Sequence, residues 1–156
     1  MTHRLAFVLT AFLGANGALA QAAETVDATS DASTEQDALF ADGQTATLDD
    51  FLWLKRPVVV FADSDRDPRF TQQIDLLNAL PHEMLERDVV VLTDTDPAAG
   101  SALREALRPR GFMLVVMGKD GKIYLRKPAP RNIREISRTI DSMPVRQQEI
   151  RDSHSR

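Results

Sequence analysis

Three short apolar runs constrain the fold of this chain more than any other feature of its sequence. Each consists of five or six residues dominated by Val, Leu, Phe and Met. Continuous apolar runs of this length are typical of strands that are buried on both faces. The sequence therefore predicts a central sheet with helices on both sides. The runs are Val58–Ala62, Val89–Thr93 and Phe112–Met117.

Helical patterns separate these runs. After the first and the second run an Asp-Pro pair occurs, Asp67-Pro68 and Asp96-Pro97. Such a pair is typical of a helix N-cap followed by the first helical position. The helix between the first two strands predicts that these strands pair in parallel through a right-handed connection.

The third run is followed by a predicted hairpin and a last helix. Asp120-Gly121 lies between the third run and the strand-like residues Ile123–Arg126. This spacing predicts a fourth strand that is antiparallel to the third. Apolar residues then recur at helical spacing over Ile133–Ile140, and Pro144 is expected to end that helix.

The first twenty residues are typical of a secretory signal peptide. A basic start at His3 and Arg4 is followed by the apolar Leu5–Leu13 and by Ala18-Leu19-Ala20 as a cleavage site. An uncleaved membrane anchor is the alternative, although the apolar run is short for a spanning helix. We expect a periplasmic or secreted protein with no stable membrane span after cleavage.

The rest of the chain divides into three parts by composition. Residues 21–44 are rich in Ala, Ser, Thr and acids and are predicted to be a disordered leader. Residues 45–144 are predicted to form the domain, and residues 145–156 a polar C-terminal tail that frays. Thr47 and Asp50 fit a capping box at the start of the domain. Trp53, the only tryptophan, is predicted to be a packing anchor.

The composition excludes several classes of function. The chain contains no cysteine, which excludes thiol–disulfide oxidoreductase chemistry, cysteine nucleophiles and thiolate metal sites. The net charge is −4, and no basic patch is evident, so nucleic acid is not an expected partner. His82 stands alone beside Glu83 and is interpreted as an exposed helix residue. No cofactor is expected.

The predicted order of elements resembles the minimal thioredoxin pattern. Arg66-Asp67-Pro68-Arg69 stands in the place of that family's Cys-Gly-Pro-Cys, and Met113 falls where its cis-proline would lie. The resemblance implies an α/β fold with a four-stranded mixed sheet of order 4-3-1-2, strand 3 antiparallel, flanked by helices. It implies no redox centre, because both cysteines and the proline are replaced.

Three longer segments carry a closer resemblance. They are "LDDFLWLKRPVVVFA", "GFMLVVMGKDGKIYLR" and "IDSMPVRQQEIR". They resemble an exported bacterial family called domain of unknown function family 4174, over residues 46–151. Members of that family look like cysteine-free thioredoxin-like domains, and the resemblance implies no catalytic residue.

One edge of the predicted sheet is the expected place for a site. In the thioredoxin arrangement the carboxyl ends of the first two strands meet the start of the third. Ligands of open α/β sheets bind at the carboxyl ends of strands. We expect a non-catalytic module that binds another protein or an envelope component there. The predicted contact residues are Asp65, Arg66, Arg69, Phe70, Arg110, Phe112 and Met113.

Aspartates at the same edge allow an alternative interpretation. A divalent-metal-dependent phosphatase-like hydrolase would use Asp63 as nucleophile and Asp65 as acid/base. A Mg²⁺ or Ca²⁺ site would use Asp63, Asp65 and Asp94, because both ions prefer oxygen ligands. A calcium loop of the EF-hand type fails, since Pro68 and Ile74 stand where glycine and glutamate are needed.

Helix capping explains most of this acidic cluster without a ligand. Asp67 and Asp96 are predicted caps, and acids are favoured near helix N-termini. Asp63 and Asp65 suit a strand-to-helix turn.

Overall fold

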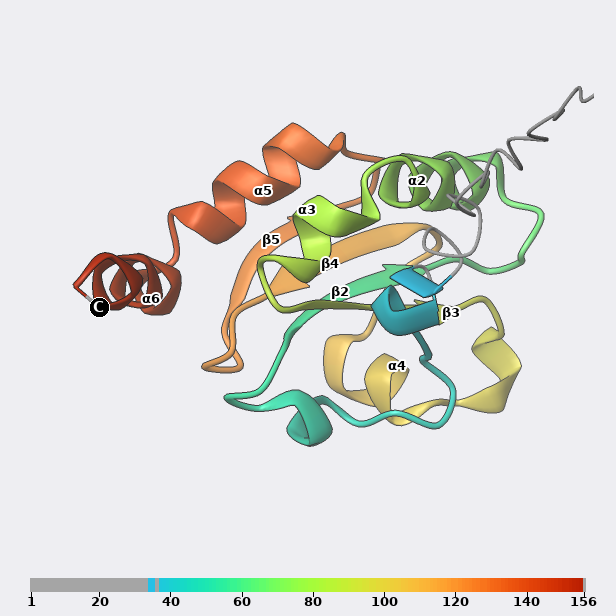
Figure 1. Ribbon diagram of the computed structural model, residues 1–156. Helices are drawn as coiled ribbons and strands as arrows, with labels where there is room; N and C mark the ends of the chain where they lie inside the picture. Colours follow the sequence, from blue (N-terminus) through green and yellow to red (C-terminus); the bar gives the residue numbers. More distant parts are fainter. Residues whose placement is uncertain (1–33, 36, 156) are drawn as a thin grey trace, which may run out of the picture.

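The computed structural model describes residues 34–35 and 37–155, in which a five-stranded mixed sheet has helices on both faces (Figure 1). The predicted signal peptide and residues 21–33 of the predicted leader lie outside the described residues. The strands are β1 (Phe40–Asp42), β2 (Arg56–Phe61), β3 (Val89–Asp94), β4 (Met113–Met117) and β5 (Ile123–Lys127). The α-helices are α2 (Pro68–Asn78), α3 (Pro81–Leu85), α4 (Ala102–Leu107), α5 (Ile133–Asp141) and α6 (Pro144–His154), and the short 3-10 helices are η1 (Leu48–Phe51) and η2 (Pro97–Ala99).

The strands lie in the order β1-β3-β2-β4-β5. β2 pairs in parallel with β3, and β4 is antiparallel to both β2 and β5. The predicted order of the four strands and the antiparallel direction of the third agree with this arrangement. The predicted number of strands is wrong, because β1 adds a fifth strand in parallel at β3.

β1 lies in the segment that was predicted to be a disordered leader. Phe40 is paired with Val91, Leu39 is fully buried, and the Gly43 amide donates to the Thr93 carbonyl at 3.2 Å. The prediction of disorder up to residue 44 is therefore wrong for its last residues. Without β1, the backbone N–H and C=O groups along the edge of β3 would be unpaired, so even a three-residue strand can pair with them. The sequence did not reveal this strand, because the average hydrophobicity of a mostly polar segment hides three residues.

Alternation along β2 divides the core into two layers. Val58 and Val60 pack on one face, under α2, α3 and α5, whereas Val59 and Phe61 pack on the other. Figure 1 shows α2, α3 and α5 above the sheet and α4 below it. Successive strand residues point to opposite faces, so one apolar run supplies both layers.

Two predicted helix boundaries differ in outcome. Asp67 caps α2 as predicted, since its carboxylate accepts from the Arg69 amide at 2.9 Å. Asp96 was predicted to open the helix that carries Leu103, but it caps only η2. Gly100 then takes a left-handed conformation with φ +59°, and Ser101 caps α4. The glycine breaks the predicted helix because left-handed backbone cannot continue a right-handed helix.

Expectations for the chain's end and for Trp53 are wrong. The helix α5 ends at Asp141, before Pro144, as predicted, but it is not the last helix, because Pro144 stands at the first turn of α6, a position that tolerates proline. The predicted polar tail is thus helical to His154. Trp53 was predicted to be a packing anchor, but 63 % of it is exposed. None of the helices in the described part of the chain is long and apolar enough to cross a membrane.

Candidate functional site

The predicted site edge exists as a continuous strip of backbone. Phe61, at the end of β2, is paired with Asp94 at the end of β3 and with Met113 at the start of β4. The segments that follow β2 and precede β4 therefore lie side by side. Close approach is shown by Asp63, whose carboxylate lies 3.7 Å from where a Cβ on Gly111 would stand. We call the segments that follow Phe61 and Asp94 and the segment that precedes Met113 the carboxyl edge.

Arg69 is an exposed residue of the carboxyl edge whose side chain is held by two neighbouring residues. Its Nε and Nη2 atoms donate to the two carboxylate oxygens of Asp67 at 3.0 and 2.7 Å. Its guanidinium carbon lies 5.5 Å from the centre of the Phe112 ring. The hydrogen bond from Arg69 lowers the pKa of Asp67, and the same bond raises the pKa of Arg69. A half-exposed guanidinium is thereby held in one orientation.

The seven predicted contact residues differ in accessibility. Phe112 is only 1 % exposed and lies under Arg69, so a partner cannot reach it without a rearrangement. Phe70 and Met113 are half-buried and pack against the two core layers. The predicted contact residues included apolar and charged side chains. Because the apolar ones are buried or half-buried, the exposed surface of the carboxyl edge is mainly charged. The exposed members are Asp65, Arg66, Arg69 and Arg110.

Asp94, a predicted metal ligand in the alternative reading, is committed to the protein's own groups. This buried carboxylate accepts from the Ser101 hydroxyl and from Arg104 Nε, the latter at 2.9 Å. Arg104 also donates to the Ala62 carbonyl at 2.6 Å. The network ties the end of β3 to α4 and to the end of β2. Its donors take the oxygen atoms that a metal ion would need.

The structure gives the metal-dependent alternative no support. No group of three or more His, Cys, Asp or Glu side chains in the described ranges is placed to hold a metal ion. Asp63 and Asp65 are exposed, whereas Asp94 is buried. His82 is exposed, as predicted, and lies 3.0 Å from Glu86 one helical turn away.

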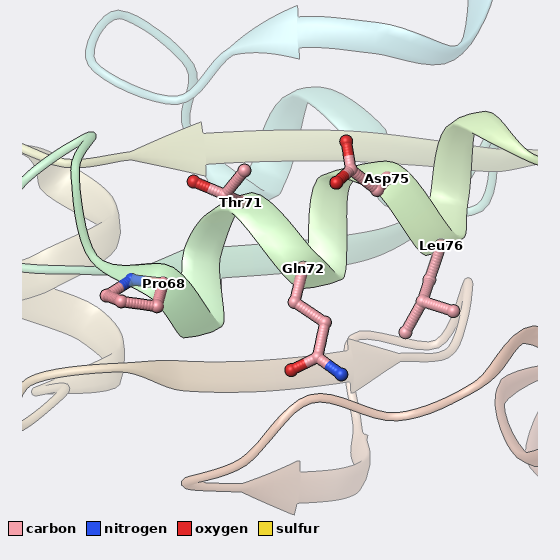
Figure 2. Close-up of a pocket in the computed structure, with 5 residues that line it drawn as sticks. All are labelled: Pro68, Thr71, Gln72, Asp75 and Leu76. Carbon is pink, nitrogen blue, oxygen red and sulfur yellow. The ribbon is translucent and has the colours of Figure 1, made fainter.

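The outer face of α2 carries a shallow groove. Figure 2 shows Thr71 and Asp75 pointing to one side of the helix and Gln72 and Leu76 to the other, with Pro68 at its start. Specific ligand sites have a few polar groups that converge on one place. The polar groups of this groove diverge, so it does not form a defined ligand site.

Sequence reasoning missed a charged cluster at the opposite end of the sheet. The Arg56 side chain, at the start of β2, is fully buried and lies 2.8 Å from Glu149 of α6. Lys119, in the turn between β4 and β5, bridges Glu149 at 2.9 Å and Asp88 at 2.8 Å. We call these four residues the amino-end cluster. The available signal was the position of Arg56, which only Pro57 separates from the first apolar run, because the start of a buried strand is itself buried.

Electrostatics hold Glu149 in its charged form. Burial raises its pKa, but hydrogen bonds from Lys119 and Arg56 outweigh this effect and leave the pKa below the ordinary value. Arg56 also donates to the Arg87 carbonyl at 2.8 Å. The cluster joins the starts of β2 and β3, the β4–β5 turn and α6. It has the features of a structural clamp.

Comparison with known proteins places the chain in a family. The chain has no significant match among curated protein sequences. The family model "Domain of unknown function (DUF4174)" matches residues 47–149 and thus runs from the cap of η1 to Glu149 of the amino-end cluster. Because this match spans more than half of the 156 residues, the chain belongs to the DUF4174 family.

Proposed function

We propose that the chain is an exported, thioredoxin-like binding domain without catalytic activity, and that it contacts another protein through the carboxyl edge. The order of β5, β4, β2 and β3, with β4 antiparallel, supports the thioredoxin-like assignment. When Arg66-Asp67-Pro68-Arg69 is set beside the Cys-Gly-Pro-Cys of a thioredoxin, Arg66 and Arg69 stand at the positions of the two cysteines. A binding surface thus replaces a redox centre on the same scaffold.

The preorganised guanidinium of Arg69 carries this proposal. Asp67 fixes it on two atoms, and the Phe112 ring supports its face. A guanidinium that is already oriented loses little conformational entropy when it binds a carboxylate, and planar bidentate pairing gives specificity. Exposed Arg66 and Arg110 lie on the same edge. The arginines therefore suit carboxylates of a partner protein, and the exposed Asp63 and Asp65 beside them suit neighbouring basic groups of that partner.

Site-specific photocrosslinking in the native envelope tests the contact. A crosslinker at Arg66 is expected to give one discrete adduct, and a crosslinker at the exposed Arg138 on α5 is expected to give none. Charge reversal by Arg69→Glu together with Arg110→Glu should abolish the Arg66 adduct. An adduct that survives charge reversal would contradict an arginine-based contact, and absence of any adduct would contradict the contact itself.

Export is tested separately. Cell fractionation with mass spectrometry of the recovered chain should find it in the envelope or medium, with Gln21 at its N-terminus. A cytoplasmic chain that retains Met1 would contradict the signal-peptide assignment and leave the carboxyl-edge proposal standing.

A further inference from the structure

Three consecutive large apolar residues are exposed just before β2. Leu52, Trp53 and Leu54 have exposed fractions of 41, 63 and 67 %. We call them the apolar tip. Single exposed apolar residues are common on protein surfaces, but contiguous ones mark interaction sites. The tip precedes Arg56, whereas the carboxyl edge follows Phe61, so the two surfaces lie at opposite ends of β2.

The backbone of the tip is tied down by the protein itself. The Trp53 amide donates to the Lys119 carbonyl at 2.8 Å. The amides of Leu52, Leu54 and Lys55 donate to carbonyls of η1 at 3.0 to 3.2 Å. All four N–H groups therefore have partners within the chain. A segment with this property can enter an apolar medium without leaving these donors unpaired.

Trp53 is held in a conformation that aromatic residues rarely adopt. Its φ is +62°, in the left-handed region where a bulky side chain is strained. The backbone keeps this strained conformation although 63 % of the residue is exposed. Strain retained at an exposed aromatic residue indicates that its outward orientation is a feature of the fold.

The tip forms a projecting end together with the β4–β5 turn. Figure 1 shows the segment before β2 beside this turn, at the end of the sheet away from the carboxyl edge. A Cβ on Gly121 would lie 3.2 Å from Leu52 Cδ1, so Leu52 rests on the turn. Ile123, which follows the same turn at the start of β5, is a further exposed apolar residue, with an exposed fraction of 45 %.

We propose that the apolar tip docks reversibly into the interface of a lipid bilayer. A stable interface between protein chains buries about 800 Å² on each partner, and three side chains with Ile123 offer far less. A bilayer surface requires no complementary shape, and the boundary between headgroups and acyl chains favours Trp beside Leu. This docking goes beyond the proposed protein contact and holds whether or not that contact exists.

The charges around the tip determine how the docking should respond to salt. Asp49 and Asp50 precede the tip, Lys55 follows it, and Lys122 lies beside Gly121 in the turn. All four are exposed, and their charges balance. Insertion of apolar side chains, rather than attraction to anionic lipid, is therefore the driving force, and salt should change the binding little.

Trp53 provides the test, because it is the only tryptophan in the chain. The protein, as recovered from the producing cells, is titrated with phosphatidylcholine vesicles, with and without phosphatidylglycerol. We expect a blue shift of the Trp53 emission and quenching by lipids brominated along the acyl chain. Both effects should persist at high salt.

Two matched variants separate docking by the tip from binding elsewhere. Leu52→Ser with Leu54→Ser should weaken the partition coefficient about tenfold, since the apolar area of both side chains is lost. Leu80→Ser, an exposed leucine between α2 and α3, should leave it unchanged. All variants share one N-terminus, so any contribution of that segment cancels. Circular dichroism checks that each variant is folded.

Three results would overturn the proposal. They are an unshifted and unquenched Trp53 at millimolar lipid, binding that high salt abolishes, and equal partitioning of the double variant and the wild type. An emission shift that depends on protein concentration and not on lipid would assign the tip to a contact between copies of this chain instead.

Discussion

The buried guanidinium of Arg56 lies 2.8 Å from the carboxylate of Glu149, which is 93 positions further along the chain. This contact joins the start of the central strand to α6, which buries no residue of its own. α6 is thus held to the domain by charge rather than by an apolar face. The family match ends at the same glutamate.

Removal of Glu149 should destabilise the whole domain. In Glu149→Ala the charge of Arg56 stays buried with weaker compensation, since Asp88 is 3.8 Å away. We expect a loss of about 3 kcal/mol in the free energy of unfolding, as is typical when one partner of a buried pair is removed. Urea denaturation measures it. Glu135→Gln, which alters a pair on the surface of α5, is the control and should cost less than about 1 kcal/mol. Equal losses in the two variants would contradict the clamp.

The contribution of Glu149 should vary with pH in a defined direction. Its pKa in the folded protein lies below the ordinary value of 4.5, so the folded state binds the proton less readily than the unfolded state. The stabilisation is fully present above the ordinary pKa and is lost as the pH falls through it toward the folded pKa. Between about pH 5 and pH 3 the stability of the wild type should fall more steeply than that of Glu149→Gln. Parallel curves would contradict the assignment.

Trp53→Gly should leave the domain as stable as the wild type or slightly more so. Glycine adopts positive φ without the penalty of about 1 kcal/mol that other residues carry, and little of the indole is buried. A buried packing anchor would instead cost about 3 to 5 kcal/mol on removal. Thermal and urea unfolding distinguish these outcomes, with Leu77→Ala in the core as the destabilised reference.

The segment before residue 45 should prove to be part of the domain. Leu39→Ala removes a fully buried side chain and should cost about 2 to 5 kcal/mol. Gly43→Ala would place a Cβ 2.5 Å from the Thr93 carbonyl oxygen, so β1 must shift and stability should fall. Ala46→Gly, just beyond β1, is a mild comparison. Wild-type stability in both test variants would restore the interpretation of this segment as a leader.

Divalent metal ions should not stabilise the fold. The carboxylate of Asp94 is held by Arg104 and Ser101, which leaves Asp63 and Asp65 as the two exposed members of the predicted ligand set. A ligand at ~100 times its Kd would add about 2.7 kcal/mol. We therefore expect the same unfolding midpoint with and without millimolar Mg²⁺ or Ca²⁺. A midpoint that rises with metal, and no longer rises in Asp63→Asn, would reinstate the metal site.

The candidate site was partly predictable. Strand pairing brings the ends of β2 and β3 to the start of β4, as the resemblance to thioredoxin implied. Accessibility was not predictable, because Phe112 packs in the core layer of Val58 and Val60 and its ring also lies 5.5 Å from the Arg69 guanidinium carbon. The capping role of Asp67 could be predicted from its neighbour Pro68. The pairing of Asp94 could not, because its partner Arg104 lies on α4, ten residues further along the chain.

The apolar strands and the hairpin at Gly121 could be predicted from the residues alone, and the order of the strands was implied by the resemblance to thioredoxin. The strands and the hairpin depend on contiguous hydrophobicity and local turn chemistry, which adjacent residues encode. Three features became visible only in the folded chain: Leu39 and β1 belong to the sheet, Glu149 neutralises Arg56, and Trp53 is exposed. Each of these depends on atoms from distant segments, and their relative positions are set when the two core layers pack.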